Sequence, residues 1–249
     1  MKRDGESPQS PAAAPSGAAA VFGDRLGLAE RFVATLADTG VTHGLIGPRE
    51  VPRLWERHVL NCAVIADAFP AGARVVDVGS GAGLPGVALA IARPDLEVHL
   101  VEPMLRRTTW LEQLVTELEL LDVTVHRGRA EEVGPQLCSA WVTARAVARL
   151  GTLARWCLPL LEPGGTVVAM KGRSAREELA ADHEALTALG LGTAVVTEHG
   201  LGVLPEPVLT VDLTFPHGSS SPARVRAGRP RSGRRGGTAG STQRRRRRR

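Results

Sequence analysis

The ten-residue segment Asp77–Gly86 (DVGSGAGLPG) constrains the fold of this chain more than any other feature. It follows the mostly apolar residues 73–76 and precedes the apolar run 87–91, which is the order of buried strand, glycine turn and helix. Glycines permit a tight turn and let a ligand approach the backbone, because no Cβ stands in the way. This order predicts the start of a nucleotide-binding α/β domain.

The spacing of the glycines indicates which ligand the turn holds. Gly79, Gly81 and Gly83 form the pattern GxGxG. The dinucleotide-binding pattern GxGxxG would need Gly or Ala at position 84, where this chain has Leu84. An acidic residue directly before GxGxG, here Asp77, is typical of proteins that bind S-adenosylmethionine (SAM), which carries no phosphate. The alternative is a tight strand–helix turn without a ligand.

From residue 73 on, short apolar strands alternate with helices. Strands are expected at 73–78, 97–102, 122–127, 139–144, 165–171, 193–199 and 207–215, and helices at 85–92, 104–119, 149–159 and 174–189. The alternation predicts a mostly parallel sheet with helices on both faces. The last two strands are expected to form a hairpin at the sheet edge. Seven strands that end in such a hairpin match the Rossmann-like class I fold of SAM-dependent methyltransferases.

Composition at the two ends and the order of helices and strands between them divide the chain into four expected parts. They are a disordered N-terminal extension (1–20), an N-terminal helical cap (21–70), a SAM-dependent methyltransferase domain (71–215) and a disordered Arg-rich tail (216–249). The cap is expected to contain two amphipathic helices, at 22–40 and 51–69.

Charge is distributed unevenly between these parts. The chain of 249 residues has 31 basic and 26 acidic residues, a formal net charge of +5. The tail holds 12 arginines and no acid, which leaves 19 basic against 26 acidic residues in 1–215, a net charge of −7. A flexible basic tail is expected either to tether the protein to RNA without sequence preference or to be a dispensable, solvated extension.

Two further features concern the cellular compartment. No run of 18 or more apolar residues exists, so no transmembrane helix and no membrane partner are expected. The three cysteines have neither CxxC nor metal-ligand spacing, which favours buried thiols in a reducing compartment and no metal site. We therefore expect a cytoplasmic protein.

Candidate site residues follow the strands, because ligands of such sheets bind at the carboxyl ends of strands. Glu102 ends the second strand, where a carboxylate can accept both ribose hydroxyls; the alternative is a solvated strand-end acid. Residues 128–132 follow the third strand and are placed to hold adenine, although acids there can also cap a helix. Arg145 follows the fourth strand and faces SAM, an RNA phosphate or a surface ion pair. Lys171 follows the fifth, at the mouth of the same cleft.

No general base stands out in the sequence. Exocyclic-amine methyltransferases often carry a (Asp/Asn)-Pro-Pro-aromatic turn after the fourth strand, where this chain has 145–148 (RAVA). No cysteine follows a proline, as the nucleophile of cytosine C5 enzymes usually does. A ring nitrogen such as guanine N7 needs no deprotonation, so its methylation can rest on alignment alone. The catalytic residues stay unassigned, with Arg145 and Lys171 as candidates.

With these residues in view, the chain closely resembles the family of ribosomal RNA small subunit methyltransferase G, also called glucose-inhibited division protein B. The resemblance covers roughly residues 25–215 and rests on five segments, Glu56–Leu60, Asp77–Gly86, Gly128–Glu132, Thr143–Ala146 and Met170–Gly172. It implies methyl transfer from SAM to N7 of one guanine in the 530 loop of bacterial 16S rRNA. The implied partner is 16S rRNA or the small ribosomal subunit, and we expect a monomer.

The resemblance also implies roles for single residues. The cofactor contacts of the family fall on Gly79, Leu84, Ala130, Glu131 and Arg145, beside Gly81 and Gly83 of the turn, and Glu102 occupies the place of the ribose-binding acid. Arg57 and His58 match a pair on the substrate side, which with Lys171 implies contact with RNA. The alternative for His58 is a satisfied helix histidine. Asn61 stands where many members have Asp.

Two other functions stay open. A small-molecule SAM methyltransferase would suit the acidic residues 1–215 but leaves the tail and the Arg57–His58 pair unexplained. A non-catalytic, SAM-responsive RNA-binding protein is the other, although the intact turn with Lys171 and Arg145 argues against a decayed site. Transfer of labelled methyl from SAM to RNA separates all three.

Overall fold

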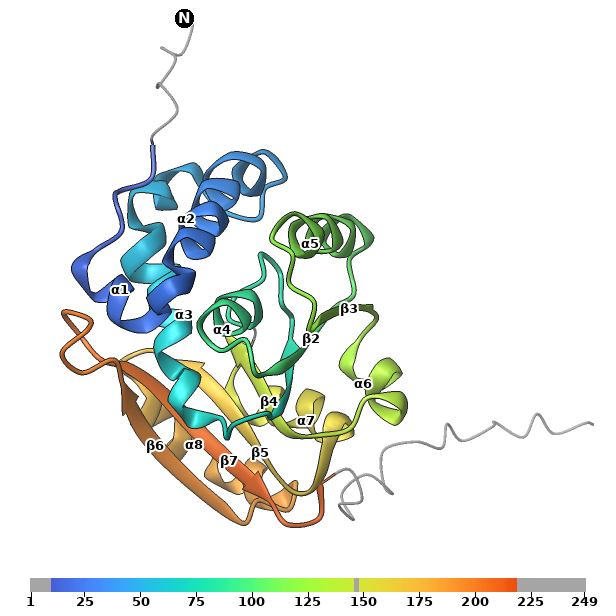
Figure 1. Cartoon of the computed structure of the whole chain (residues 1–249). Helices are drawn as coiled ribbons and strands as arrows, with labels where there is room; N and C mark the ends of the chain where they lie inside the picture. The colour runs from blue at the N-terminus through green and yellow to red at the C-terminus, as the bar shows by residue number, and fades with distance from the viewer. Residues whose placement is uncertain (1–9, 146–147, 219–249) are drawn as a thin grey trace, which may run out of the picture.

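The fold is a single seven-stranded sheet in the order β3-β2-β1-β4-β5-β7-β6 (Figure 1). The computed structural model describes residues 10–145 and 148–218, and every structural statement below concerns these residues. The strands are β1 (Arg74–Val78), β2 (Glu97–Glu102), β3 (Val123–Arg127), β4 (Ser139–Arg145), β5 (Leu161–Lys171), β6 (Thr193–His199) and β7 (Val208–Phe215).

The pairing of the strands confirms the predicted class I arrangement. β1 to β5 pair in parallel, whereas β7 runs antiparallel to both of its neighbours, β5 and β6. The two final strands therefore form the expected hairpin. β7 lies inside the sheet, between β5 and β6, and β6 is the edge strand.

Helices cover both faces of the sheet (Figure 1). They are α4 (Gly86–Ala92) and α5 (Leu105–Glu117) on one face, and α6 (Ala130–Val133), α7 (Leu150–Cys157) and α8 (Ala175–Ala188) on the other. Alternate strand residues enter the two cores, because successive side chains point to opposite faces. Val75 packs in the core of α4 and α5, and its neighbour Val76 packs in the core of α7 and α8.

The N-terminal helices differ from the prediction. The chain is helical over nearly all of the predicted ranges 22–40 and 51–69, but the helix type changes several times within each. The segments are α1 (Ser16–Phe22), a 3-10 turn (Gly23–Arg25), α2 (Leu26–Thr35), a π-helical turn (Leu36–Gly40), a 3-10 segment (Pro48–Arg53), a second π-helical turn (Leu54–Val59), α3 (Leu60–Ala63) and a 3-10 turn (Val64–Ala68).

The predicted extent of terminal disorder is also corrected in part. α1 begins at Ser16 and buries Ala18, so residues 16–20 belong to the folded protein and not to an extension. At the other end Pro216 is described as well, and its carbonyl oxygen accepts the N–H of Gly164 at 3.1 Å. The remaining part of both predictions, residues 1–9 and 219–249, lies outside the described residues.

The N-terminal helices share one apolar core with α4 and α5. Side-chain hydrogen bonds fix them further: Trp110 Nε1 donates to Thr39 Oγ1 at 3.0 Å, and the buried His199 Nδ1 lies 2.7 Å from Asp67 Oδ1. The 54–59 turn is therefore held in a fixed place relative to the sheet.

Neither a membrane-spanning helix nor a metal-binding cluster occurs among the described residues. No helix in them has the length and apolar character needed to cross a membrane. No group of three or more His, Cys, Asp or Glu residues in the described ranges is placed to hold a metal ion.

Candidate functional site

Asp77 lies fully buried at the base of the glycine turn. Its Oδ2 accepts the backbone N–H of Gly86 at 3.0 Å, whereas its Oδ1 has no hydrogen-bond partner among the described residues. Burial raises the pKa of Asp77 to about 7, and the charge of Glu102 contributes to the rise. A buried acceptor without a partner is costly, and a cationic ligand nearby would favour its ionised form.

Glu102 is buried against the same turn, with only 2% of its surface exposed. Its Oε2 accepts the N–H of Gly81 at 3.2 Å and its Oε1 accepts the N–H of Met104 at 3.0 Å. Arg107 Nη1 lies 3.4 Å from Oε2. Glu102 is therefore no solvated strand-end acid, because it ties the glycine turn to the end of β2.

A cavity of about 310 Å³ opens beside the turn, and we call it the loop cavity. It is lined by Val78, Gly79, Val101, Pro103, Gly128, Arg129, Ala130, Glu131 and Trp156, at the ends of β1, β2 and β3. Mostly apolar walls with a few polar groups are typical of small-molecule sites. Three of the predicted cofactor residues thus line one cavity: Gly79, Ala130 and Glu131.

Trp156 is a wall of the loop cavity that sequence reasoning missed. It lies on α7 and is 40% exposed, although large aromatic side chains are usually well buried. In the sequence it is one tryptophan of a short helix, and nothing there indicates a place beside the glycine turn.

The other predicted residues of the turn do not line the loop cavity. Gly81 donates its N–H to Glu102, and Leu84 is buried in the core. Gly83 has φ of +79°, and a Cβ there would lie 2.6 Å from Val87 Cγ2. Their geometry shapes the turn, and a direct cofactor contact by any of them stays a prediction.

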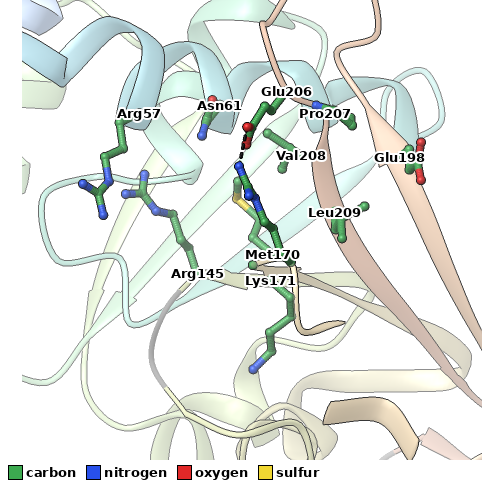
Figure 2. A pocket seen from close by; sticks show the side chains of 12 residues that line it. Arg57, Asn61, Arg145, Met170, Lys171, Glu198, Glu206, Pro207, Val208 and Leu209 are labelled. Atoms are coloured by element: carbon green, nitrogen blue, oxygen red, sulfur yellow. Dashed lines mark hydrogen bonds and ion pairs between the residues drawn. The ribbon is translucent and has the colours of Figure 1, made fainter. Parts of the chain in front are cut away.

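A second cavity, of about 660 Å³, lies over the neighbouring strand ends, and we call it the basic cavity (Figure 2). It is lined by Arg57, Asn61, Arg145, Met170, Lys171, Gly172, Arg173, Glu198, Glu206, Pro207, Val208 and Leu209. It thus contains Arg57, Arg145 and Lys171 of the predicted site residues. His58 does not line it.

Lys171 lines the basic cavity without offering its amine to it. Its Nζ donates to the carbonyl oxygen of Ala148 at 2.7 Å and to Glu178 Oε1 at 2.8 Å. Figure 2 shows the side chain extending away from Arg57 and Arg145. The amine of Lys171 thus bonds β5 to α8, and the substrate contact predicted for Lys171 stays a prediction.

Arg145 is half-buried and lines the basic cavity, and no carboxylate among the described residues lies within ion-pair distance of it. Its Nη2 lies 2.6 Å from His58 Nδ1, and its Nη1 donates to Cys62 Sγ at 3.0 Å. His58 Nε2 in turn lies 2.8 Å from Glu50 Oε2. The surface ion pair, the alternative for Arg145, is not formed among the described residues. Both ring nitrogens of His58 have partners, as the alternative of a satisfied helix histidine expects, and the RNA contact predicted for His58 stays a prediction.

The two cavities occupy two halves of one sheet edge. The loop cavity lies over β1, β2 and β3, and the basic cavity lies over β4, β5 and the start of β7. β1 and β4 are paired neighbours, so Arg145 stands where the two halves meet.

Residues 25–202 match the family model of rRNA small subunit methyltransferase G. The chain belongs to this family. Ribosomal RNA small subunit methyltransferase G of Salinispora arenicola is 53% identical over 224 residues, which cover 87% of this chain and 92% of that protein. The same-named protein of Rhodococcus jostii is 55% identical over 194 residues, 77% of this chain and 85% of that one.

A solved structure supports the fold alone. A proposed SAM-dependent methyltransferase of Methanococcus maripaludis superimposes with a TM-score of 0.51 at 11% identity, over 75% of this chain and 91% of that chain. As a member of the methyltransferase G family, the chain is a SAM-dependent methyltransferase.

The residues around the loop cavity fit the cofactor of a methyltransferase G protein. SAM carries a sulfonium and an ammonium charge, and the two buried carboxylates at the turn, Asp77 and Glu102, favour a cationic ligand over a pyrophosphate. The apolar walls suit a purine ring. We expect Gly79, Ala130, Glu131 and Trp156 to hold the adenosine part.

Proposed function

We propose that this protein methylates N7 of a guanine in the 530 loop of bacterial 16S rRNA, acting in the cytoplasm as a monomer. The observation that carries the proposal is the pair of adjacent cavities on one strand edge, one suited to SAM and one basic. The relatives in Salinispora and Rhodococcus are named for methylation of small-subunit rRNA, which supports rRNA as the substrate.

The reaction depends on alignment of the methyl group with guanine N7 more than on proton transfer. When bound, SAM supplies an electrophilic methyl group on its sulfonium sulfur. The lone pair of guanine N7 is free at neutral pH, so no base has to remove a proton before attack. Holding two reactants in line can supply roughly 7–11 kcal/mol of a reaction barrier. We assign this work to the residues that line the two cavities.

The basic cavity supplies positive charge to a protein whose residues 1–215 carry net negative charge. Arg57, Arg145 and Arg173 line it beside Glu198 and Glu206, and Arg173 forms an ion pair with Glu206. The side chains of Arg57 and Arg173 are 58% and 84% exposed. Arginine is well suited to phosphate groups, because its planar guanidinium can donate two parallel hydrogen bonds. We expect these residues to hold the RNA backbone around the target guanine.

The deciding experiment is methyl transfer from labelled SAM to small ribosomal subunits that lack their native N7 methylation, followed by strand cleavage at 7-methylguanosine. We expect one new cleavage, in the 530 loop. Label incorporated elsewhere in 16S rRNA would overturn the site. No incorporation despite intact SAM binding would favour a small-molecule substrate, or a non-catalytic RNA-binding protein if no methyl acceptor is found.

A further inference from the structure

The guanidinium of Arg145 is held entirely by uncharged acceptors. They are His58 Nδ1 at 2.6 Å, Cys62 Sγ at 3.0 Å and the carbonyl oxygen of His58 at 3.5 Å. Cys62 is fully buried, and burial raises the pKa of its thiol, so the sulfur stays protonated and neutral. Among the described residues no carboxylate lies within ion-pair distance of Arg145, so its positive charge is oriented but not neutralised.

The contact with Arg145 fixes the state of His58. An arginine only donates hydrogen bonds, so Nδ1 of His58 must be the acceptor and the proton of the neutral ring must lie on Nε2. That proton points at Glu50 Oε2, 2.8 Å away. Burial lowers the pKa of His58, which keeps the ring in this neutral form at pH 7.

Glu50 serves two of the arginines that line the basic cavity, Arg57 directly and Arg145 through His58. Its Oε1 lies 3.7 Å from Arg57 Nη1, and its Oε2 reaches Arg145 through the His58 ring. Arg57 and His58 are consecutive residues of the 54–59 π-helical turn. Turns of this kind are frequent at functional sites, because they displace side chains from regular helical positions.

We propose that Glu50 and His58 are a positioning pair, which holds Arg145 where the loop cavity meets the basic cavity so that its charge can bind an anionic oxygen of a ligand. The oxygen belongs either to the carboxylate of SAM or to an RNA phosphate. The inference rests on the proposed function. It gives His58 a role through Arg145 and not through RNA.

A double-mutant cycle on the full chain tests the pair. SAM affinity is measured by calorimetry, and the KM for unmethylated small subunits by methyl transfer, in wild type, Arg145→Ala, His58→Ala and the double variant. We expect Arg145→Ala and His58→Ala each to weaken the same ligand by about 10-fold, and His58→Ala to add little once Arg145 is absent. A loss in calorimetry assigns the SAM carboxylate, and a loss confined to the KM for subunits assigns a phosphate.

Conservative and control variants separate positioning from folding. His58→Asn keeps an oxygen acceptor close to the place of Nδ1, so it should restore most of the binding lost in His58→Ala. His43→Ala is the matched control, because that exposed histidine contacts only the carbonyl oxygen of Thr39. Likewise, Glu50→Ala should weaken binding, whereas the exposed Glu56→Ala should not.

The proposal is overturned if His58→Ala binds both ligands like wild type, or if its loss is equally large in the Arg145→Ala background. A loss that His58→Asn does not restore also counts against it. These outcomes differ from failure of the proposed function, because calorimetry with SAM alone does not depend on the identity of the methyl acceptor.

Discussion

At the scale of single residues, burial of Asp77 links stability to pH. Its folded-state pKa of about 7 lies above the ordinary value of 3.8, because burial penalises the charged form. Between these two values the unfolded chain has released the proton while the folded protein still holds it. Rising pH therefore favours unfolding across this window.

We expect the free energy of unfolding of wild type to contain a component that falls between about pH 4 and pH 7. Asp77→Asn removes this titration and keeps an oxygen for the Gly86 N–H, so its stability should depend less on pH. Urea unfolding at several pH values measures the difference. Parallel pH profiles of the two proteins would contradict the assignment.

Substitution by alanine is expected to have opposite effects on stability at Gly86 and at Gly27. A Cβ at Gly86 would lie 2.3 Å from Leu100 Cδ2 and 2.9 Å from Asp77 Oδ2, whereas nothing lies within 4 Å of a Cβ at Gly27 in α2. We expect Gly86→Ala to destabilise by about 1–3 kcal/mol and Gly27→Ala to stabilise by about 0.5–1 kcal/mol. Equal unfolding midpoints for the two variants would refute this.

At the scale of elements, Lys171 and Glu178 hold the start of α7. Glu178 Oε1 accepts both Lys171 Nζ and the backbone N–H of Leu150, each at 2.8 Å. The side chains of Lys171 and Glu178 are only 11% and 19% exposed, so removing the amine leaves a poorly hydrated carboxylate.

We expect Lys171→Met to lower the free energy of unfolding by about 1–3 kcal/mol without changing SAM affinity. Arg176→Met is the matched control, because its ion pair with Glu198 is 3.9 Å long and exposed, and such pairs contribute little. Thermal unfolding and calorimetry report the two quantities. A large loss of SAM affinity in Lys171→Met would show that the amine serves the site.

The elements of the sheet could be predicted from sequence more closely than the N-terminal helices. Apolar runs between turn residues predicted β2 and β6 with their observed bounds and β1, β3, β4 and β7 to within one residue. β5 begins at Leu161, four residues before its predicted start. A helical period of 3.6 contains no signal for the π-helical turns at 36–40 and 54–59, where one turn takes in an additional residue. Pro52 lies inside the 3-10 segment that precedes the second π-helical turn, and a proline at such a place indicates an irregular helix.

Site residues that act through the backbone were predicted more easily than those that act through distant partners. The position of Gly79 at a strand end is a local property of the glycine turn. The partners of Arg145 and Lys171 are not local in the sequence. His58 lies 87 residues from Arg145, and Ala148, whose carbonyl oxygen accepts the Lys171 amine, lies 23 residues from Lys171. A family resemblance names such residues without saying which atoms they contact.

At the scale of the whole molecule, the net charge of residues 1–215 differs in sign from that of the C-terminal segment 216–249. All 12 arginines of the last 34 residues fall within 219–249, outside the described residues, whereas residues 1–215 carry net negative charge. Basic residues that contact phosphates release counterions, so their contribution to binding falls as salt rises.

We expect deletion of residues 219–249 to weaken binding to small subunits at low salt and to make the dependence of affinity on salt less steep. SAM affinity should be unchanged, because none of the residues that line the loop cavity belongs to this segment. Filter binding over a range of salt concentrations is the measurement. Identical curves with and without the segment would show that it is dispensable for RNA binding.

The position of β7 has a consequence for synthesis of the protein. It is the last strand to be made, yet it pairs with both β5 and β6 in the finished sheet. Until residue 208 has been added, β5 keeps an open edge and β6 has no place to pair. Open strand edges promote association between chains. A premature stop before Val208 would therefore yield a chain that already contains every wall of the loop cavity but is prone to aggregate.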